Sequence, residues 1–305
     1  MRKLVSFEDF LEEASELPPL KTALLAPENE EVVTGVKRAV LNKIIEPVFI
    51  GNKDKIQLAA QKINFDISKF KIHEIEERME IARKGIELYY KGEVSLACKG
   101  QIPTAYIYKA IIRKEKELQL NNRIAVYSVW DLKNPEQLVL LTDTGVNIYP
   151  DWQAKTEVLK KAVNFMKSLG YKDLKVLALS AAREINKEVS SMNDIEKIKE
   201  VFDREQVPCR FKHGKNLQPF LDTTSQDSFP DIILVPNLET GNITVKLDFL
   251  LDIERYSAVI SSKGPVIVPS RSDNAEKIYR QLGFGAVISN RLHRQQESSK
   301  RSEVY

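Results

Sequence analysis

The chain has 305 residues, of which 43% are hydrophobic and 29% are charged, a composition of globular domains rather than of disordered chains. Its 46 basic and 43 acidic residues are mixed along the sequence and leave a net charge of +3, so we expect no surface of one sign that would bind a nucleic acid. No run approaches the roughly 18 apolar residues of a membrane-spanning helix, and the start of the sequence turns acidic before a signal-peptide core could form, which predicts a cytoplasmic protein without a membrane partner.

The first part of the chain alternates predicted strands with predicted helices. Short apolar runs predict strands at 21–27, 46–52, 70–75 and 94–100. The segments between them predict helices at 30–42, 53–62 and 76–93. Because each strand is followed by a helical crossover, the pattern favours a parallel sheet with helices on both faces.

The pattern changes in the middle of the chain and then returns. Two apolar runs at 123–132 and 136–144 are joined by the turn-like Lys133-Asn134-Pro135, which predicts a β-hairpin. Alternation resumes with a helix, a strand, a helix and a strand, at 152–169, 174–180, 193–205 and 231–237.

The last part of the chain predicts one more buried strand and one more helix. The β-branched run 266–268 is short and bounded by prolines, as in a parallel sheet, and the helix starts at Asn274. Because glycine is a poor helix former, Gly283 and Gly285 predict a break in this helix. The polar segment 293–305 predicts a frayed end.

The length allows two such α/β domains, each with its own core. We place the first domain at 1–148, completed by the C-terminal helix at 274–305, and the second at 149–273. The predicted fold is therefore two doubly wound α/β/α domains with a largely parallel sheet. Polar strand ends occur on both sides of the boundary, so the active cleft is expected between the two domains.

Several common catalytic signatures are missing from the sequence. It contains no GxxxxGK[ST] loop, no GxGxxG after a strand and no GxSxG nucleophile elbow. Cys98 and Cys209 lie far apart, and the three histidines are scattered, so neither a disulfide framework nor a zinc site is predicted. We therefore expect a mechanism without a metal.

Polar residues follow four of the predicted strands. The four groups are Cys98-Lys99-Gly100, Thr142-Asp143-Thr144 with Asn147, residues 236–242, and Ser270-Arg271-Ser272-Asp273. Each group also has a purely structural interpretation: Lys99 is a solvated charge, and Thr142-Asp143 is a turn. In the same interpretation Asn237 and Asn242 cap one helix, and Asp273 or Asn274 caps the last. Their shared position at the carboxyl ends of strands instead predicts one pocket for a phosphate or another oxyanion.

The first two groups resemble motifs of the phosphate acetyltransferase and phosphate butyryltransferase family. Ala97-Cys98-Lys99-Gly100 with Thr104 is similar to the family's LMKG element and the threonine that follows it. Thr142-Asp143 with Asn147 is similar to its TDxxxN element.

The last two groups extend the resemblance in the same order. Residues 230–246 are similar to the family's AD-I-L-L-V-P-D-x-E-x-G-N-x-x-x-K element, and Ser270, Arg271 and Asp273 match its SR-x-D element. The likeness covers nearly the whole chain from Ala26 to about residue 290. Chain length and the SR-x-D element are closer to the butyryl branch.

The resemblance implies an isocitrate/isopropylmalate dehydrogenase-like fold and a cytoplasmic homo-oligomer, a dimer or larger. It implies transfer of a short, butyryl-like acyl group between coenzyme A and phosphate through a ternary complex. The partners would be acyl-CoA, phosphate and acyl phosphate. Coenzyme A would be a substrate, and no cofactor would be bound permanently.

The same resemblance suggests roles for individual residues. Asp273 would be the base for the thiol, Arg271 would hold the phosphoryl oxygens, and Ser270 would donate to the phosphate or the tetrahedral oxyanion. The remaining predicted contacts to phosphate or coenzyme A are Lys99, Thr142, Asn147 and Asn242. Cys98 is expected to be a core residue rather than a nucleophile.

Two segments depart from the family pattern and leave an alternative function open. Residues 213–219 read HGKNLQP, where the family has a DGPxxxD-like segment, and 181–194 read AAREINKEVSSMND, where it has an E-V-x-N-P-K-M-P-S-T-x-D type of stretch. The alternative is a homologue that binds acyl-CoA or acyl phosphate without turnover. An oxidoreductase of the isocitrate dehydrogenase type is disfavoured, because the chain lacks a cluster of acidic metal ligands and a nucleotide-binding loop.

Overall fold

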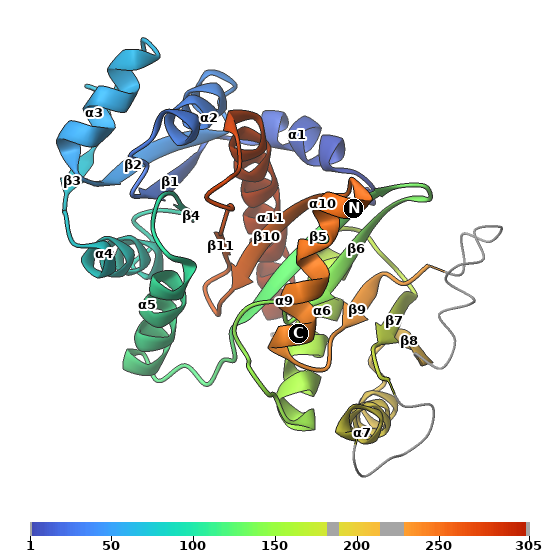
Figure 1. The fold of residues 1–305 in the computed structure, drawn as a ribbon. Helices are drawn as coiled ribbons and strands as arrows, with labels where there is room; N and C mark the ends of the chain where they lie inside the picture. The colour runs from blue at the N-terminus through green and yellow to red at the C-terminus, as the bar shows by residue number, and fades with distance from the viewer. Residues whose placement is uncertain (1, 182–188, 214–228, 303–305) are drawn as a thin grey trace. The chain divides into compact units, whose positions relative to one another are not determined.

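The computed structural model describes residues 2–181, 189–213 and 229–302 (Figure 1). Contacts divide the chain into two compact units. We call them the Lys99 unit, Phe7–Asn122 with Tyr256–Tyr305, and the Asp143 unit, Met1–Ser6 with Arg123–Arg255. This division falls before the hairpin, whereas the sequence predicts a boundary after it, at residue 148. The second hairpin strand pairs with a strand near residue 232, so the hairpin extends the sheet of the Asp143 unit.

The Lys99 unit contains a largely parallel sheet with strand order β3-β2-β1-β4-β11-β10. Its strands are β1 (Leu20–Leu25), β2 (Ile45–Gly51), β3 (Ile72–Glu74), β4 (Leu96–Lys99), β10 (Glu254–Ile260, whose first two residues fall in the Asp143 unit) and β11 (Pro265–Ile267). Only β10 runs antiparallel to its neighbour β11. Its helices are α1 (Phe7–Glu16), α2 (Glu30–Leu41), α3 (Lys53–Lys62), α4 (Arg78–Tyr90), α5 (Thr104–Glu117) and α11 (Ala275–Ser302).

Helices cover both faces of this sheet (Figure 1). The Leu25 side chain of β1 faces Gly85 of α4, and α4 packs against α5. The side chains of Leu96 and Ile267 face Gly285 of α11, which also packs against α1 and α2. The predicted alternation of strands and helices and the parallel pairing are therefore confirmed in this unit.

The Asp143 unit contains largely parallel sheet strands in the order β5-β6-β9-β7-β8. Its strands are β5 (Ala125–Lys133), β6 (Glu136–Thr142), β7 (Leu174–Ala178), β8 (Cys209–His213) and β9 (Ile232–Leu234). Its helices are α6 (Trp152–Ser168), α7 (Ser190–Arg204), α9 (Leu238–Lys246) and α10 (Asp248–Leu251). The predicted hairpin is the antiparallel pair β5 and β6, and the other pairs are parallel.

The sheet of the Asp143 unit also has helices on both sides (Figure 1). Trp130, Val139 and Leu141 form a buried cluster with Val245 of α9 on one face. Because side chains alternate along a strand, the other residues of β6 project to the opposite face, where α6 packs. Each unit therefore has the doubly wound architecture that the sequence predicts. No helix of the described ranges is long and apolar enough to cross a membrane.

The C-terminal helix corrects two predictions. It passes through Gly283 and Gly285 without a break, and it continues to Ser302, beyond the start of the segment that was expected to fray. The glycines sit where α11 approaches its neighbours most closely. A Cβ atom at Gly285 would lie 2.6 Å from Cγ1 of Ile267 and 3.0 Å from Cδ2 of Leu96. Close packing against the sheet therefore outweighs the low helix propensity of glycine.

We expect the substitution Gly285→Ala to lower the free energy of unfolding by about 1–3 kcal/mol, because the added methyl group overpacks a rigid strand. This loss should appear even though alanine favours a helix over glycine by about 1 kcal/mol. Gly283→Ala is the control, since its Cβ would come close only to Cδ2 of Leu11, at the flexible end of a side chain, and its other neighbours lie 3.8 Å away. Urea unfolding should show a lower free energy of unfolding for Gly285→Ala but not for Gly283→Ala. Equal stability of both variants would contradict the overpacking at residue 285.

Candidate functional site

The carboxyl ends of β1, β4 and β11 lie at one edge of the sheet in the Lys99 unit, because the three strands are parallel neighbours. In this register Lys99 pairs with Leu25, and Cys98 pairs with Ile267. The chain leaves β11 and enters the turn Ser270–Asp273, which we call the SRSD turn. Lys99 and this turn thus follow adjacent strands, and Arg271 and Asp273 act electrostatically on Lys99.

Hydrogen bonds fix the conformation of the SRSD turn. The backbone N–H of Ser270 donates to Oδ2 of Asp273 at 2.8 Å, and Nε2 of Gln281 donates to the same oxygen at 2.8 Å. Oγ of Ser270 lies 2.9 Å from Oγ of Ser272. The Arg271 side chain is exposed and forms no ion pair with any described residue. The turn therefore presents an unpaired guanidinium beside an oriented carboxylate.

The cap of α11 is Asn274 and not Asp273. Oδ1 of Asn274 accepts from the backbone N–H of Lys277 at 2.9 Å. The N–H of Ala275 donates to Oε2 of Glu31 in α2 at 2.6 Å. Two N–H groups of the first turn of α11 are thus bound by these side chains, whereas the carboxylate of Asp273 accepts from Ser270 and Gln281 instead.

Lys99 is a buried cation at the same edge of the sheet. Lys99 is only 3% exposed, and its Nζ donates to the carbonyl oxygen of Gly100 at 3.2 Å. Burial lowers the pKa of Lys99 to about 8, and Arg271 also lowers it, whereas Cys98 and Asp273 act in the opposite direction. Lys99 is therefore not the solvated surface charge of the structural interpretation, and its side chain loses its proton around pH 8.

Cys98 precedes Lys99 and has the properties of a core residue. It is 3% exposed, and burial raises the pKa of its thiol to about 12, an effect that the nearby charge of Lys99 reduces only in part. A thiol with this pKa stays protonated at neutral pH and is a poor nucleophile. The structure therefore agrees with the expectation that Cys98 packs in the core.

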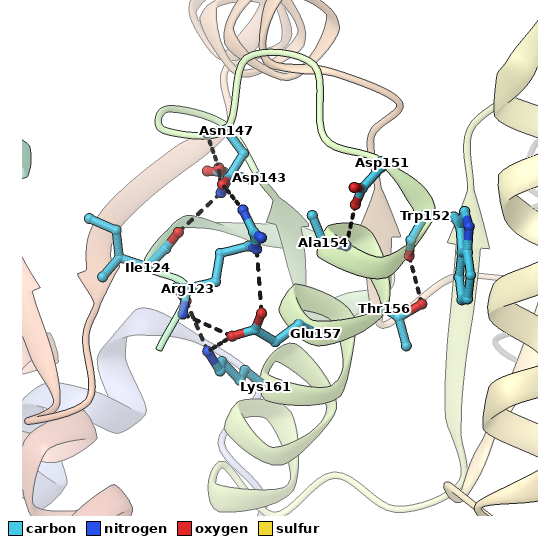
Figure 2. A network of polar contacts seen from close by, with 10 residues as sticks. All are labelled: Arg123, Ile124, Asp143, Asn147, Asp151, Trp152, Ala154, Thr156, Glu157 and Lys161. Atoms are coloured by element: carbon cyan, nitrogen blue, oxygen red, sulfur yellow. Dashed lines mark hydrogen bonds and ion pairs between the residues drawn. The ribbon is translucent and has the colours of Figure 1, made fainter. Parts of the chain in front are cut away.

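In the Asp143 unit, the carboxylate of Asp143 holds the loop after β6 together (Figure 2). Oδ1 accepts from the backbone N–H groups of Val126 at 2.8 Å and Gly145 at 3.0 Å. The N–H of Val146 lies 3.3 Å from both carboxylate oxygens. Oδ2 accepts from the backbone N–H and from Nδ2 of Asn147, both at 2.6 Å. Asp143 is thus an anchor for its own loop.

The amide of Asn147 belongs to the same network (Figure 2). Nδ2 also donates to the carbonyl oxygen of Ile124 at 3.0 Å, and Nη1 of Arg123 donates to Oδ1 at 3.4 Å. Arg123 is held in turn by Glu157 of α6, whose Oε1 accepts from its backbone N–H at 2.8 Å. In this structure the polar atoms of Asn147 therefore bind protein groups.

The other predicted residues of this unit differ in their surroundings. Oγ1 of Thr142 is buried and makes no hydrogen bond with any described residue, so it is a donor without a protein acceptor. Asn242 lies inside α9, where its Nδ2 donates to the carbonyl oxygen of Thr144 at 3.3 Å. The expectation that Asn242 caps this helix is wrong. Asn237 alone is its cap and accepts from the N–H of Thr240 at 2.9 Å.

Sequence reasoning missed Gln281, which orients Asp273. Gln281 lies eight residues after Asp273 along α11 and is 2% exposed. A long polar side chain beside Ile278 and Leu282, on the buried side of an amphipathic helix, was a usable signal, since buried amides need partners. The two departures from the family pattern lie in part outside the described residues, at 182–188 and 214–219.

Neither a metal cluster nor the largest cavity of the described ranges points to this site. No group of three or more histidine, cysteine, aspartate or glutamate residues in them could hold a metal ion. A cavity of about 660 Å³ is formed by α3, β3 and the segment between them, and none of the predicted site residues lines it. The SRSD turn and Lys99 therefore remain the best-supported site by their position and charge.

Comparisons with known proteins agree with the resemblance noted in the sequence. The family described as phosphate acetyl/butaryl transferase matches residues 80–212. The chain is 26% identical over 301 residues to phosphate butyryltransferase of Clostridium beijerinckii, covering 94% of this chain and 98% of that protein. It is 28% identical over 279 residues to phosphate acetyltransferase of Rickettsia felis, covering 88% and 80%.

A solved structure supports the fold. The branched-chain phosphotransacylase from Enterococcus faecalis superposes with a TM-score of 0.71 at 23% identity, over 88% of this chain and 99% of that one. At this identity the likeness concerns the fold alone. The family match, the two curated relatives and the ordered motifs together support placing the chain with the phosphate acetyl/butyryltransferase enzymes, to which it is similar.

Proposed function

We propose that the protein transfers a short, butyryl-like acyl group between coenzyme A and inorganic phosphate in a ternary complex. The likeness to this family supports acyl transfer between coenzyme A and phosphate as the reaction class. A phosphate butyryltransferase is among the relatives that match over nearly their whole length. The observation that favours an active site is the carboxylate of Asp273. It is freed from capping by Asn274, lies in the same turn as the unpaired Arg271 and acts electrostatically on buried Lys99.

The roles follow from the chemistry of each group in the SRSD turn. Arg271 can bind two phosphoryl oxygens with its planar fork, and Ser270 can donate to the phosphate or to the tetrahedral oxyanion. Asp273 is the proposed base for the thiol. Its Oδ2 is held by Ser270 and Gln281, and the other oxygen accepts no hydrogen bond from a described residue. No metal is needed for these steps.

The remaining predicted residues contact phosphate or coenzyme A in this proposal. Lys99 would add a second cation to the phosphate pocket. Oγ1 of Thr142 makes no hydrogen bond with a described residue, whereas Asn147 and Asn242 would have to release protein partners. These three residues belong to the Asp143 unit, so their part in one site with Lys99 depends on the predicted cleft between two domains, which stays a prediction.

The deciding experiment follows release of the coenzyme A thiol. Purified protein is mixed with butyryl-CoA and phosphate, and a thiol-reactive dye reports the free thiol. We expect release that requires phosphate and that is faster with butyryl-CoA than with acetyl-CoA. Saturable binding of butyryl-CoA without thiol release would instead support the non-catalytic alternative. Equal rates for both acyl groups would contradict the butyryl preference only.

We also propose that the protein is a homo-oligomer. Four large apolar side chains of the segment from α9 to α10 are strongly exposed: Ile243 at 62%, Phe249 at 75%, Leu250 at 66% and Leu251 at 58%. Apolar clusters of this kind usually mark contact surfaces. Sedimentation velocity of the protein and of Phe249→Glu tests this proposal, and a monomeric parent protein would contradict it.

Replacing Arg271 with lysine should raise the apparent KM for phosphate about tenfold or more, with a smaller effect on the KM for butyryl-CoA. A lysine keeps the charge but cannot form two parallel hydrogen bonds to phosphoryl oxygens. The measurement varies phosphate at saturating butyryl-CoA. Arg280→Lys is the matched control, since that arginine already pairs with Glu276 and Glu8. An unchanged KM for phosphate would remove Arg271 from the phosphate site.

Phosphate binding should weaken as the pH rises through about 8, because Lys99 loses its charge there. The sign follows from the lowered pKa: the ammonium form is complete below about pH 7 and nearly absent above about pH 9. Calorimetric titration with inorganic phosphate should show the dissociation constant rising by up to about tenfold per pH unit above 8. In Lys99→Arg, which stays charged, the constant should be flat over this range. A pH dependence that survives in the arginine variant would contradict the assignment.

A further inference from the structure

Lys99 differs from the other strongly buried lysine of the described chain in its partners. Lys155 is 6% exposed, and its Nζ forms an ion pair with Oδ2 of Asp194 at 2.6 Å. Lys99 is 3% exposed, and Nζ forms no ion pair with a described residue; its one hydrogen bond goes to the carbonyl oxygen of Gly100 at 3.2 Å. A buried ammonium without an anionic partner is destabilised, so the neutral amine becomes accessible.

A neutral amine is a nucleophile, and its availability here is unusual for a lysine. With a pKa of about 8, roughly half of the Lys99 side chains are uncharged at pH 8. An ordinary lysine with a pKa of about 10.4 is less than about 1% uncharged at this pH. Burial therefore raises the fraction of reactive amine by about two orders of magnitude.

The position of Lys99 places this amine beside the SRSD turn. β4 and β11 are hydrogen-bonded parallel neighbours, and Lys99 follows directly after the pair of Cys98 with Ile267. The charges of Arg271 and Asp273 both act on it. A phosphoryl group held by Arg271 would therefore bring its acyl carbon into the surroundings of Nζ.

We propose that Lys99 is a self-acylation site, modified by an acyl phosphate bound on the SRSD turn. The inference rests on the proposed function, because that function supplies the acyl phosphate. Nζ attacks the carbonyl carbon, the bond between this carbon and the bridging oxygen breaks, and inorganic phosphate leaves with the electron pair. The amine proton passes to the phosphate or to solvent, and an amide of Lys99 remains.

The modification would act as a control on the enzyme. The thiol of coenzyme A and the amine of Lys99 compete for the same acyl group, so the amide accumulates when acyl phosphate is abundant and coenzyme A is scarce. Acylation removes the positive charge of Lys99 and fills space at the carboxyl end of β4. The acylated enzyme should therefore bind phosphate and acyl phosphate more weakly than the unmodified enzyme.

The test uses the purified full chain and butyryl phosphate without coenzyme A at pH 8. Mass spectrometry of digested samples measures butyrylation at each lysine with time. We expect Lys99 to react at least tenfold faster than Lys155, with a rate that saturates in butyryl phosphate and falls when inorganic phosphate is added. Arg271→Lys should slow the reaction at Lys99 and leave the background at Lys155 unchanged. Equal rates at the two lysines, or a rate that does not saturate, would overturn the inference.

Two further measurements test whether the acyl group reacts first with Cys98 and whether the same protein turns over. Hydroxylamine cleaves a thioester at Cys98 but not an amide at Lys99, and the variant Cys98→Ala should retain the Lys99 adduct. Adduct loss with hydroxylamine or in this variant would overturn direct attack by Lys99.

Thiol release is assayed in the same preparation, and turnover without the adduct refutes this inference alone. The adduct without turnover supports it and contradicts the proposed function, and absence of both contradicts both.

Discussion

Replacing Asp273 with asparagine should lower kcat by a factor on the order of 10²–10⁴, the range for loss of a positioned general base. The stability of the protein should change little. The side chain makes its hydrogen bonds as an acceptor through Oδ2, and an asparagine oxygen can still accept from Ser270 and Gln281. What asparagine cannot do is take the proton of the thiol. The measurement is kcat for thiol release together with a urea unfolding curve of the same variant.

The control for this substitution is Asn274→Ser, which keeps a side-chain acceptor at the true cap of α11. It should leave kcat within about twofold of the parent protein and cost only a few tenths of a kcal/mol. Similar losses of kcat in both variants would show that the SRSD turn is sensitive only as a structure. Unchanged kcat in Asp273→Asn, in an active protein, would remove Asp273 from catalysis.

The largest expected loss of stability comes from Asp143→Ala. Asp143 is 5% exposed, and its carboxylate accepts the hydrogen bonds that hold the loop after β6. Removing it leaves several N–H donors without partners, at a cost of about 3–5 kcal/mol in the free energy of unfolding. Chemical denaturation followed by circular dichroism measures the change.

A matched control is Asp151→Ala. Asp151 also accepts from a backbone N–H, that of Ala154 at 2.7 Å, but as the simple cap of α6 (Figure 2). Its loss should cost only about 1 kcal/mol. If both variants lost the same amount, the network around Asp143 would add nothing beyond a single cap.

The alternation of strands and helices was predictable because each unit buries strands on both faces. Such strands read as continuous apolar runs, as at 46–52 and 94–100, and helices between them have strong signals. Asn29 is the cap of α2. The buried residues Val32, Val36 and Ala39 of this helix recur at helical spacing. Five elements were not predicted: the helices α1, α5 and α10 and the strands β8 and β10. Of these, α5 begins after Pro103 without a side-chain cap.

The site was predictable in its residue types but not in its hydrogen bonds. The sequence indicated that Lys99 and the SRSD turn follow strands, and the pairing of β4 with β11 makes them neighbours. It could not decide between Asp273 and Asn274 as the cap, since both side chains cap helices equally well. Nor could it show that Asp143 and Asn147 bind each other, because that contact depends on the path of the loop.

The place of β11 has a consequence for the synthesis of the chain. β11 pairs with β4, yet nearly all of the Asp143 unit is encoded between them. A growing polypeptide can therefore complete the contacts of residues 123–255 while β4 still has an open edge, because its partner has not yet been made. Open strand edges invite association with other chains. The Lys99 unit thus closes its sheet last, and the SRSD turn takes its place beside Lys99 only at this final step, so a nascent chain cannot be active early.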